Sequence, residues 1–124
     1  MTTSDTMTVS KGSKMQISIN TSGEITILEL VGKLDTQTSP EAQARLDELI
    51  EQGGRKILVH LGQLDYISSA GLRVLLAASK QLKPQGGEIR ICSLNDVVRE
   101  VFDISGFVTI FRVFGSEAEA LDGF

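Results

Sequence analysis

Alternating apolar and polar residues predict that the ordered part of the chain begins with a β-hairpin. Every second residue over 15–20 is apolar, which is the period of a half-buried strand. Ser22-Gly23 then supplies a turn into residues 24–31, where apolar side chains fall on both faces, so this strand should lie inside the sheet. Residues 1–13 are polar and lack a period, and we expect them to form a flexible tail before one domain over 14–124.

Two stretches of helical period follow, and each leads into a short apolar run that suits a buried strand. Ser39-Pro40-Glu41 has the cap, the proline and the early carboxylate of a helix start. Gly53-Gly54 ends this helix before the apolar run 57–59. The pattern repeats with a helix over 69–83 and a strand over 88–92. Such strand–helix–strand units predict parallel strands in the middle of the sheet.

The rest of the chain predicts two further helices and a last extended segment. Asn95 can cap a third helix, and Ser116 can cap a short terminal one, with a strand or extended segment over 107–113 between them. The fold class is therefore α/β. The C-terminal ends of parallel strands share one edge of a sheet, so the loops at 35–38, 62–68 and 93–95 should converge around Ser69.

Composition excludes several classes of function. The 124 residues suffice for one domain with a hydrophobic core, and a net charge of -4 without a basic face argues against nucleic acid as a partner. No apolar stretch has the length of a signal peptide or a membrane span, so we expect a cytoplasmic protein that does not bind membranes. The single cysteine, Cys92, ends a predicted strand and is best explained as core filler.

The run Ser68-Ser69-Ala70-Gly71 places two hydroxyls at the start of an apolar helix. One serine there is explained by capping of the backbone N–H groups. The second hydroxyl, followed by two small residues, favours a phosphorylation site, because the first turn of a helix stabilises a phosphate. Such a phosphate would add about -1.5 to -2 charges to an acidic protein and would repel a surface that binds the unmodified form.

Catalysis by the chain itself has little support. His60 is the only histidine, and a Ser69–His60 arrangement with Asp35 or Asp65 lacks the Gly-x-Ser-x-Gly turn of a serine hydrolase. One His and one Cys in separate elements have no metal-ligand spacing. The paired glycines follow helices and precede strands, which is the reverse of a phosphate-binding loop. We therefore expect no enzyme activity, no bound metal and no cofactor.

Four pieces of the chain follow one another in a distinctive order. Residues 31–35 contain Gly-x-Leu-Asp, and residues 64–72 contain the two serines. Residues 86–89 place paired glycines before a strand, and residues 98–107 form a helical stretch that ends in Ser-Gly-Phe. In this order and at these separations they resemble the STAS-domain family, and within it the small bacterial anti-sigma factor antagonists. The resemblance implies a mixed sheet of four to five strands with parallel central strands and about four flanking helices.

This resemblance also implies a partner switch. The unphosphorylated protein would bind an anti-sigma factor that is also an ATP-dependent serine kinase of the histidine-kinase-like type, and would thereby release a sigma factor. The kinase would phosphorylate the antagonist and detach it, and a PP2C-type phosphatase with bound Mn or Mg would reset it. The antagonist would be a monomer or a weak dimer. STAS-like domains also occur in stress-sensing and transport complexes, so a non-switching assembly module is the alternative.

Within the resembling loop, Ser69 matches the position of the phosphate acceptor. Ser68 stands where the family often has aspartate, and it remains the alternative acceptor and an expected partner contact. Asp65 and Gly71 belong to the same expected contact surface. Arg73, one turn into the helix, is placed to contact a carboxylate or a phosphate, although a solvated arginine would explain it equally simply.

The Gly-x-Leu-Asp piece adds the remaining expected contacts. Asp35 matches the family's loop aspartate, and Thr36 and Thr38 flank it as polar partner contacts. An aspartate in such a turn also bonds nearby backbone N–H groups, and we rate that role for Asp35 at least equal to a direct one.

Overall fold

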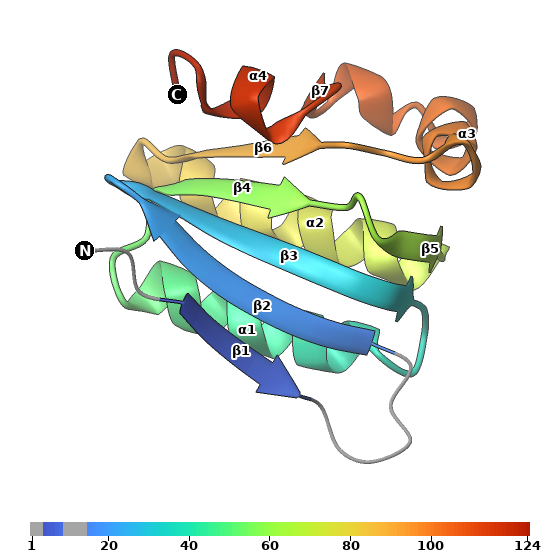
Figure 1. Cartoon of the computed structure of the whole chain (residues 1–124), viewed down its shortest axis with the longest axis horizontal. Helices are drawn as coiled ribbons and strands as arrows, with labels where there is room; N and C mark the ends of the chain where they lie inside the picture. The colour runs from blue at the N-terminus through green and yellow to red at the C-terminus, as the bar shows by residue number, and fades with distance from the viewer. Residues whose placement is uncertain (1–3, 9–14) are drawn as a thin grey trace.

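The computed structural model describes residues 4–8 and 15–124, which form one sheet with helices packed on it (Figure 1). The strands are β1 (Ser4–Thr8), β2 (Met15–Ser22), β3 (Ile25–Leu34), β4 (Lys56–His60), β5 (Leu64–Ile67), β6 (Glu88–Cys92) and β7 (Arg112–Phe114). The helices are α1 (Ser39–Glu51), α2 (Ser69–Leu82), α3 (Asp96–Ser105) and α4 (Glu117–Leu121), with the short 3-10 helices η1 (Lys83–Gln85) and η2 (Phe107–Thr109).

The sheet has an antiparallel part and a parallel part. Its order is β1-β2-β3-β4-β6-β7, and β5 pairs with β3 beyond the end of β4. The first three strands are antiparallel neighbours, whereas β4, β5, β6 and β7 all join by parallel pairing. The parallel strands β3, β4 and β6 run toward the edge of the sheet where β5 and α3 lie, at the right of Figure 1.

The expected fold class is confirmed, but the expected number of strands was too low. The central strands are parallel, as predicted. The strands that were not expected are β1 and β5, which have five and four residues and are defined by backbone pairing with a longer neighbour. β1 lies inside the segment expected to be a tail and pairs with β2. The other residues of that expected tail, 1–3 and 9–14, lie outside the described part of the chain.

Helix starts agree with the sequence at two places and differ at one. The side chains of Asn95 and Ser116 accept hydrogen bonds from the third residue after them, which confirms both predicted caps. At α1 the cap position is Thr38 instead of Ser39, and Ser39 donates its hydroxyl hydrogen to the carbonyl of Asp35. The last strand or extended segment expected over 107–113 is present as β7, but it begins only at Arg112, because the chain turns at Gly106 with a φ of 79° and first forms η2.

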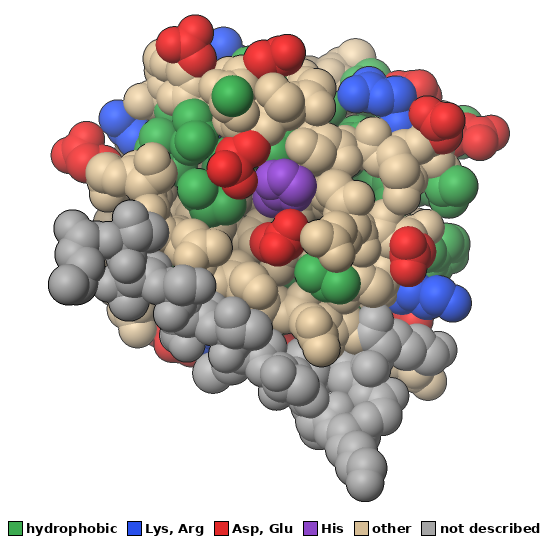
Figure 2. All heavy atoms as spheres, in the orientation of Figure 1, with side chains coloured by type: hydrophobic (Ala, Val, Ile, Leu, Met, Phe, Trp, Pro, Cys, Tyr) green, Lys and Arg blue, Asp and Glu red, His purple; other side chains and the backbone are tan. Residues whose placement is uncertain are grey.

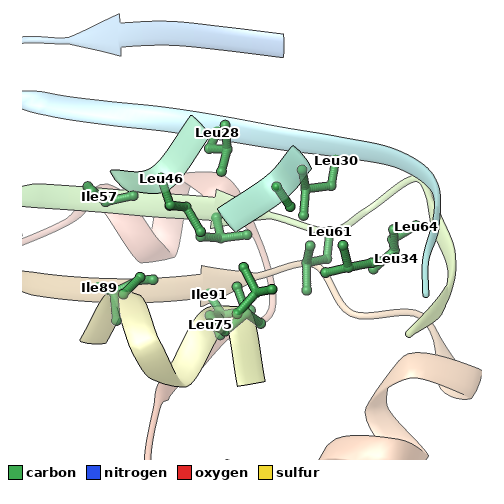
Figure 3. Close-up of a cluster of buried hydrophobic side chains, with 14 of the residues drawn as sticks. Leu28, Leu30, Leu34, Leu46, Ile57, Leu61, Leu64, Leu75, Ile89 and Ile91 are labelled. Carbon is green, nitrogen blue, oxygen red and sulfur yellow. The ribbon is translucent and has the colours of Figure 1, made fainter. Parts of the chain in front are cut away.

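The main core lies between the sheet and the helices α1 and α2. Figure 3 shows how leucines and isoleucines from both layers meet there. Leu28 on β3 and Ile57 on β4 are fully buried, as are Leu46 on α1 and Leu75 on α2. On both strands the buried core residues are two positions apart, Leu28 and Leu30 on β3 and Ile57 and Val59 on β4. Every second side chain of a strand points to the same face, so these residues form the face of the sheet that the helices cover.

The opposite side of the sheet is only partly covered. A second cluster there joins Ile27, Leu58 and Cys92 to Ala120 of α4. His60 lies on this face beyond the reach of the main core, and Figure 2 shows it in purple near the centre of the view with acidic side chains beside it. Among the described residues, no helix combines the length and the apolar character that a membrane crossing requires.

Candidate functional site

The loops that follow the parallel strands meet at one edge of the sheet, as the sequence predicted. The amide of Ser68 donates to the carbonyl of Leu34 at 2.9 Å, so the ends of β5 and β3 lie side by side. The amide of Gly32 donates to the carbonyl of Gln63 at 3.1 Å, which fastens the loop after β4 to β3. This network places the start of α2 directly beside the turn at Asp35.

The third loop is attached through Asn95. Its side-chain nitrogen donates to the carbonyl of Leu64 at 2.7 Å, while its side-chain oxygen accepts from the amide of Val98 at 2.8 Å. One amide group therefore caps α3 and fixes the beginning of β5. The sequence indicated the cap, but the bond to Leu64 could not be foreseen because it links residues 31 positions apart.

The two serines at the start of α2 have different environments. Ser68 is the N-cap residue with extended backbone angles, and its hydroxyl oxygen accepts from the amide of Gly71 at 3.3 Å. It is half-buried. Ser69 is the first residue of the helix, it is exposed, and it has no side-chain hydrogen bond with the described residues. Capping therefore occupies one serine and leaves the hydroxyl of the other accessible to a partner.

Gly71 allows α2 to approach β3 closely. A Cβ at this position would lie 2.8 Å from Cγ of Leu34, 2.8 Å from Cγ1 of Ile67 and 2.9 Å from the carbonyl oxygen of Leu34. Because Gly71 is buried, it supports the expected contact surface from beneath instead of forming part of it.

The turn between β3 and α1 is organised by Asp35 and Thr38. One carboxylate oxygen of Asp35 accepts from the amides of Gln37 and Thr38 at 2.9 and 3.1 Å. The hydroxyl of Thr38 donates to the carbonyl of Lys33 at 2.8 Å and accepts from the amide of Asp35 at 2.9 Å. Thr38 is 5% exposed, so its side chain holds the turn together and is withdrawn from the surface. Asp35 adopts the turn-forming role considered from the sequence, and Thr36 is exposed.

Several exposed side chains lie near Ser69 in the sequence. Asp65 on β5 and Arg73 on α2 are both exposed, and Arg73 lies one helical turn after Ser69 on the same side of the helix. Tyr66 is 43% exposed, and its cross-strand neighbour is Lys33. An exposed aromatic ring suits a partner contact on chemical grounds, and Tyr66 was not among the residues expected from the sequence. Its place in the sequence between the polar Asp65 and the apolar Ile67 was the only local indication that its ring is exposed.

The side chain of His60 contacts Gly62 and Glu29 on the open face of the sheet. Its Nδ1 accepts from the amide of Gly62 at 3.2 Å and lies 3.6 Å from Oε2 of Glu29 on the neighbouring strand. In the register across the sheet, His60 stands between Glu29 and Cys92. Within residues 4–8 and 15–124, no group of three or more His, Cys, Asp and Glu side chains is placed to hold a metal ion.

Residues 16–120 match the family model described as STAS domain. The chain belongs to the STAS-domain family. The matched range runs from β2 into α4 and includes the turn at Asp35, the serines at the start of α2 and the loop at Asn95. The STAS-domain fold thus accounts for nearly the whole described structure.

Curated relatives of this chain include proteins named as anti-sigma factor antagonists. BtrV of Bordetella bronchiseptica, whose name marks it as a candidate anti-sigma factor antagonist, is 44% identical over 95 residues, covering 77% of this chain and 82% of BtrV. An anti-sigma F factor antagonist of Paenibacillus polymyxa is 32% identical over 108 residues, covering 86% of this chain and 92% of the relative.

Solved structures show the same STAS fold. An anti-sigma factor antagonist from Mycobacterium paratuberculosis has a TM-score of 0.81 at 16% identity, with 91% of this chain and 96% of that chain covered. The phosphorylated form of SpoIIAA, a Bacillus cell fate determinant, has a TM-score of 0.67 at 24% identity, with 87% and 96% covered.

Proposed function

We propose that this protein is an anti-sigma factor antagonist controlled by phosphorylation of Ser69. In its unphosphorylated form it binds an anti-sigma factor that is also a serine kinase of the histidine-kinase-like ATPase type. The phosphate then weakens this complex, and a PP2C-type phosphatase restores the binding form. The observation that carries the proposal is the exposed hydroxyl of Ser69 at the first position of α2, beside a neighbouring serine that is already used as the cap.

The relatives support the regulatory class, because the names of both BtrV and the Paenibacillus polymyxa relative refer to antagonism of an anti-sigma factor. The geometry supports Ser69 over Ser68 as the acceptor. A kinase must reach a hydroxyl oxygen that can attack phosphorus, and the Ser68 hydroxyl is half-buried and bonded to the amide of Gly71. The Ser68 hydroxyl already serves as the cap of α2, whereas the Ser69 hydroxyl has no such role.

The electrostatic effect of the phosphate follows from its position. The start of a 14-residue helix carries partial positive charge, so a phosphate on Ser69 is stabilised within the protein itself. Toward a partner, however, the modification adds about two negative charges to a surface that already contains Asp65 and Asp35. A partner that binds the unphosphorylated surface therefore meets additional negative charge on a surface whose shape has not changed.

The phosphorylation test uses the purified full chain, a candidate kinase from the same organism and ATP, with the modified residue located by fragment-ion mass spectrometry. We expect a single phosphate on wild type, none on Ser69→Ala, and one on Ser68→Ala, which is the matched control for loss of a neighbouring hydroxyl. A phosphate that persists in Ser69→Ala and disappears in Ser68→Ala would overturn the assignment.

The binding test compares wild type, Ser69→Asp and Ser68→Asp for affinity to the same kinase. Charge gating predicts weaker binding for Ser69→Asp. An affinity equal to that of wild type, together with efficient phosphorylation of Ser69, would refute the gating step while leaving the acceptor assignment in place. Binding without any phosphorylation would instead favour the assembly module.

A further inference from the structure

The C-terminal segment closes an apolar patch on the open face of the sheet. We call residues 116–124, which contain α4, the C-terminal strap. Ala120 in the strap is fully buried and packs with Ile27, Leu58 and Cys92 from three neighbouring strands. Leu121 and Phe124 pack against the margin of this cluster. The patch is separate from the main core, which lies on the other side of the sheet.

One arginine holds the strap in place. Arg90 on β6 is 3% exposed, and its Nη1 donates to the carbonyls of Ala120 and Asp122, each at 3.0 Å. Its Nη2 donates to the carbonyl of Gly123 at 3.2 Å, and its Nε lies 3.0 Å from Oε2 of Glu88. Three backbone carbonyls of the strap thus depend on a single guanidinium group.

Aromatic rings complete this attachment. The guanidinium carbon of Arg90 lies 4.3 Å from the ring centre of Phe124 and 5.2 Å from that of Phe114. The ammonium group of Lys56 also donates to the backbone oxygen of Phe124 at 3.2 Å. Phe124 therefore secures the strap through its ring and through its backbone.

The strap contributes little to its own stability. Its helix has five residues, which is far too short to be stable without tertiary contacts. Its anchors lie on β4, β6 and β7, whereas the main core is formed by the sheet and the helices on the opposite face. Detachment of the strap would therefore remove a satellite cluster and leave the larger core intact, which is the usual condition for local opening.

We propose that the C-terminal strap is a conformational device that detaches as a unit from the open face of the sheet, with Arg90 as its latch. The main core and the edge that carries Ser69 stay folded in the open state. Opening exposes the patch formed by Ile27, Leu58 and Cys92. This device is independent of the proposed phosphorylation switch, because the strap lies on a different face and the Ser69 edge has its own bonds to Leu34 and Asn95.

Cys92 provides a built-in reporter of this opening. It is the only cysteine in the chain and is fully buried beneath the strap. Burial raises the pKa of its thiol, and the nearby carboxylates of Glu117 and Glu29 act in the same direction, against an opposing hydrogen bond with Ser93. The thiolate is the reactive form, so the closed state is doubly protected from thiol reagents.

The experiment measures the rate at which an aromatic disulfide reagent modifies Cys92 over a series of urea concentrations below the unfolding transition. The variant is Phe124→Ala, and the control is Ile104→Ala on the exposed side of α3, where the residue is 80% exposed. We expect labelling of wild type to depend only weakly on urea, because a small surface is exposed in the opening. We expect Phe124→Ala to label roughly three- to thirtyfold faster with an almost unchanged unfolding midpoint.

Two results would overturn the proposal. One is labelling of wild type whose urea dependence equals that of global unfolding. The other is a Phe124→Ala variant in which labelling and the global unfolding midpoint shift in proportion, since the strap would then unfold only with the whole domain. Hydrogen exchange gives an independent readout: the amides of Ala120 and Asp122 should exchange faster than the amide of Leu58, and equal protection would contradict a separate opening.

Discussion

Replacing Gly71 with alanine tests whether close packing at the start of α2 depends on the absence of a side chain. The new Cβ would lie 2.8 Å from Cγ of Leu34 and from Cγ1 of Ile67, and 2.9 Å from the carbonyl oxygen of Leu34. The two side chains can move by rotation, but the carbonyl belongs to β3 and accepts a hydrogen bond from Ser68, so the helix must shift. Overpacking of this kind typically costs about 1–3 kcal/mol.

An opposing effect reduces that cost. Alanine is favoured over glycine inside a helix by up to about 1 kcal/mol, and less in the first turn, where Gly71 lies. The expected net loss in the free energy of unfolding is therefore about 1–2 kcal/mol, which for a domain of this size lowers the melting temperature by roughly 4–10 °C. Urea unfolding followed by far-ultraviolet circular dichroism would measure it.

A matched substitution separates this effect from a general response to alanine. A Cβ added at Gly115 would have only the carboxylate of Glu119 nearby, at 3.6 and 4.0 Å, so Gly115→Ala should change stability by less than about 0.5 kcal/mol. A Gly71→Ala variant as stable as wild type, or more stable, would show that α2 can move away from β3 without cost. The account of Gly71 as a close-packing residue would then be wrong.

Substitutions at three further positions test other parts of the described structure. Thr38→Val should lower the free energy of unfolding by about 1–3 kcal/mol in urea titrations, because the amide of Asp35 and the carbonyl of Lys33 lose their buried partner. Thr38→Ser keeps the hydroxyl and should retain most of the stability. Equal losses for the two variants would contradict the role assigned to the hydroxyl. Asn95→Ala should cost about 1–3 kcal/mol, and Asn95→Ser should cost less, because serine can keep the cap on α3 and loses only the bond to Leu64. The same urea titrations would measure both, and equal losses would count against this double role. Burial raises the pKa of Cys92 in the folded state, so the neutral thiol contributes fully to folding stability below the unfolded-state pKa of 9.0, and this contribution is lost as the pH rises above it. Wild type should therefore lose stability more steeply than Cys92→Ala as the pH rises past 9.0. Parallel pH profiles of the two proteins would refute this.

The elements that the sequence predicted well are those whose period is set by the main core. The helix expected over 69–83 is α2, because its buried residues recur at helical spacing against the sheet. The strands over 57–59 and 88–92 are β4 and β6, whose helix-facing residues are fully or almost fully buried. In these segments local pattern and tertiary packing agree, and a periodicity argument is sufficient.

Other features depend on residues that are distant in the sequence. β5 has buried residues only at its two ends, and it is a strand because β3 extends beyond β4 and offers it a pairing edge. Arg90 would be expected at a surface, yet it is buried because the carbonyls at 120–123 reach it from 30 positions away. Neither the pairing nor the latch leaves a local signal in the chain.

The candidate site combines both situations. The position of Ser69 could be predicted, since the hydroxyl pair and the helix start are adjacent in the sequence. The difference between the two serines could not, because it depends on which hydroxyl the amide of Gly71 meets after folding. Likewise, Thr38 was expected at the surface as a partner contact, and the hydrogen bonds of the Asp35 turn explain why it is buried instead.

The rigidity of this edge bears on how a phosphate would act. The amide of Ser68 is bonded to Leu34, and Gly71 lies close to Leu34 of β3, so the start of α2 is held against β3 before any modification. Asn95 fixes the beginning of β5, the strand that leads into this helix. A phosphate on Ser69 would project from this fixed frame and need not rearrange it. The proposed switch is then mainly electrostatic, and its strength should follow charge: aspartate at position 69, with one negative charge against nearly two for phosphate, should weaken partner binding less than phosphorylation does.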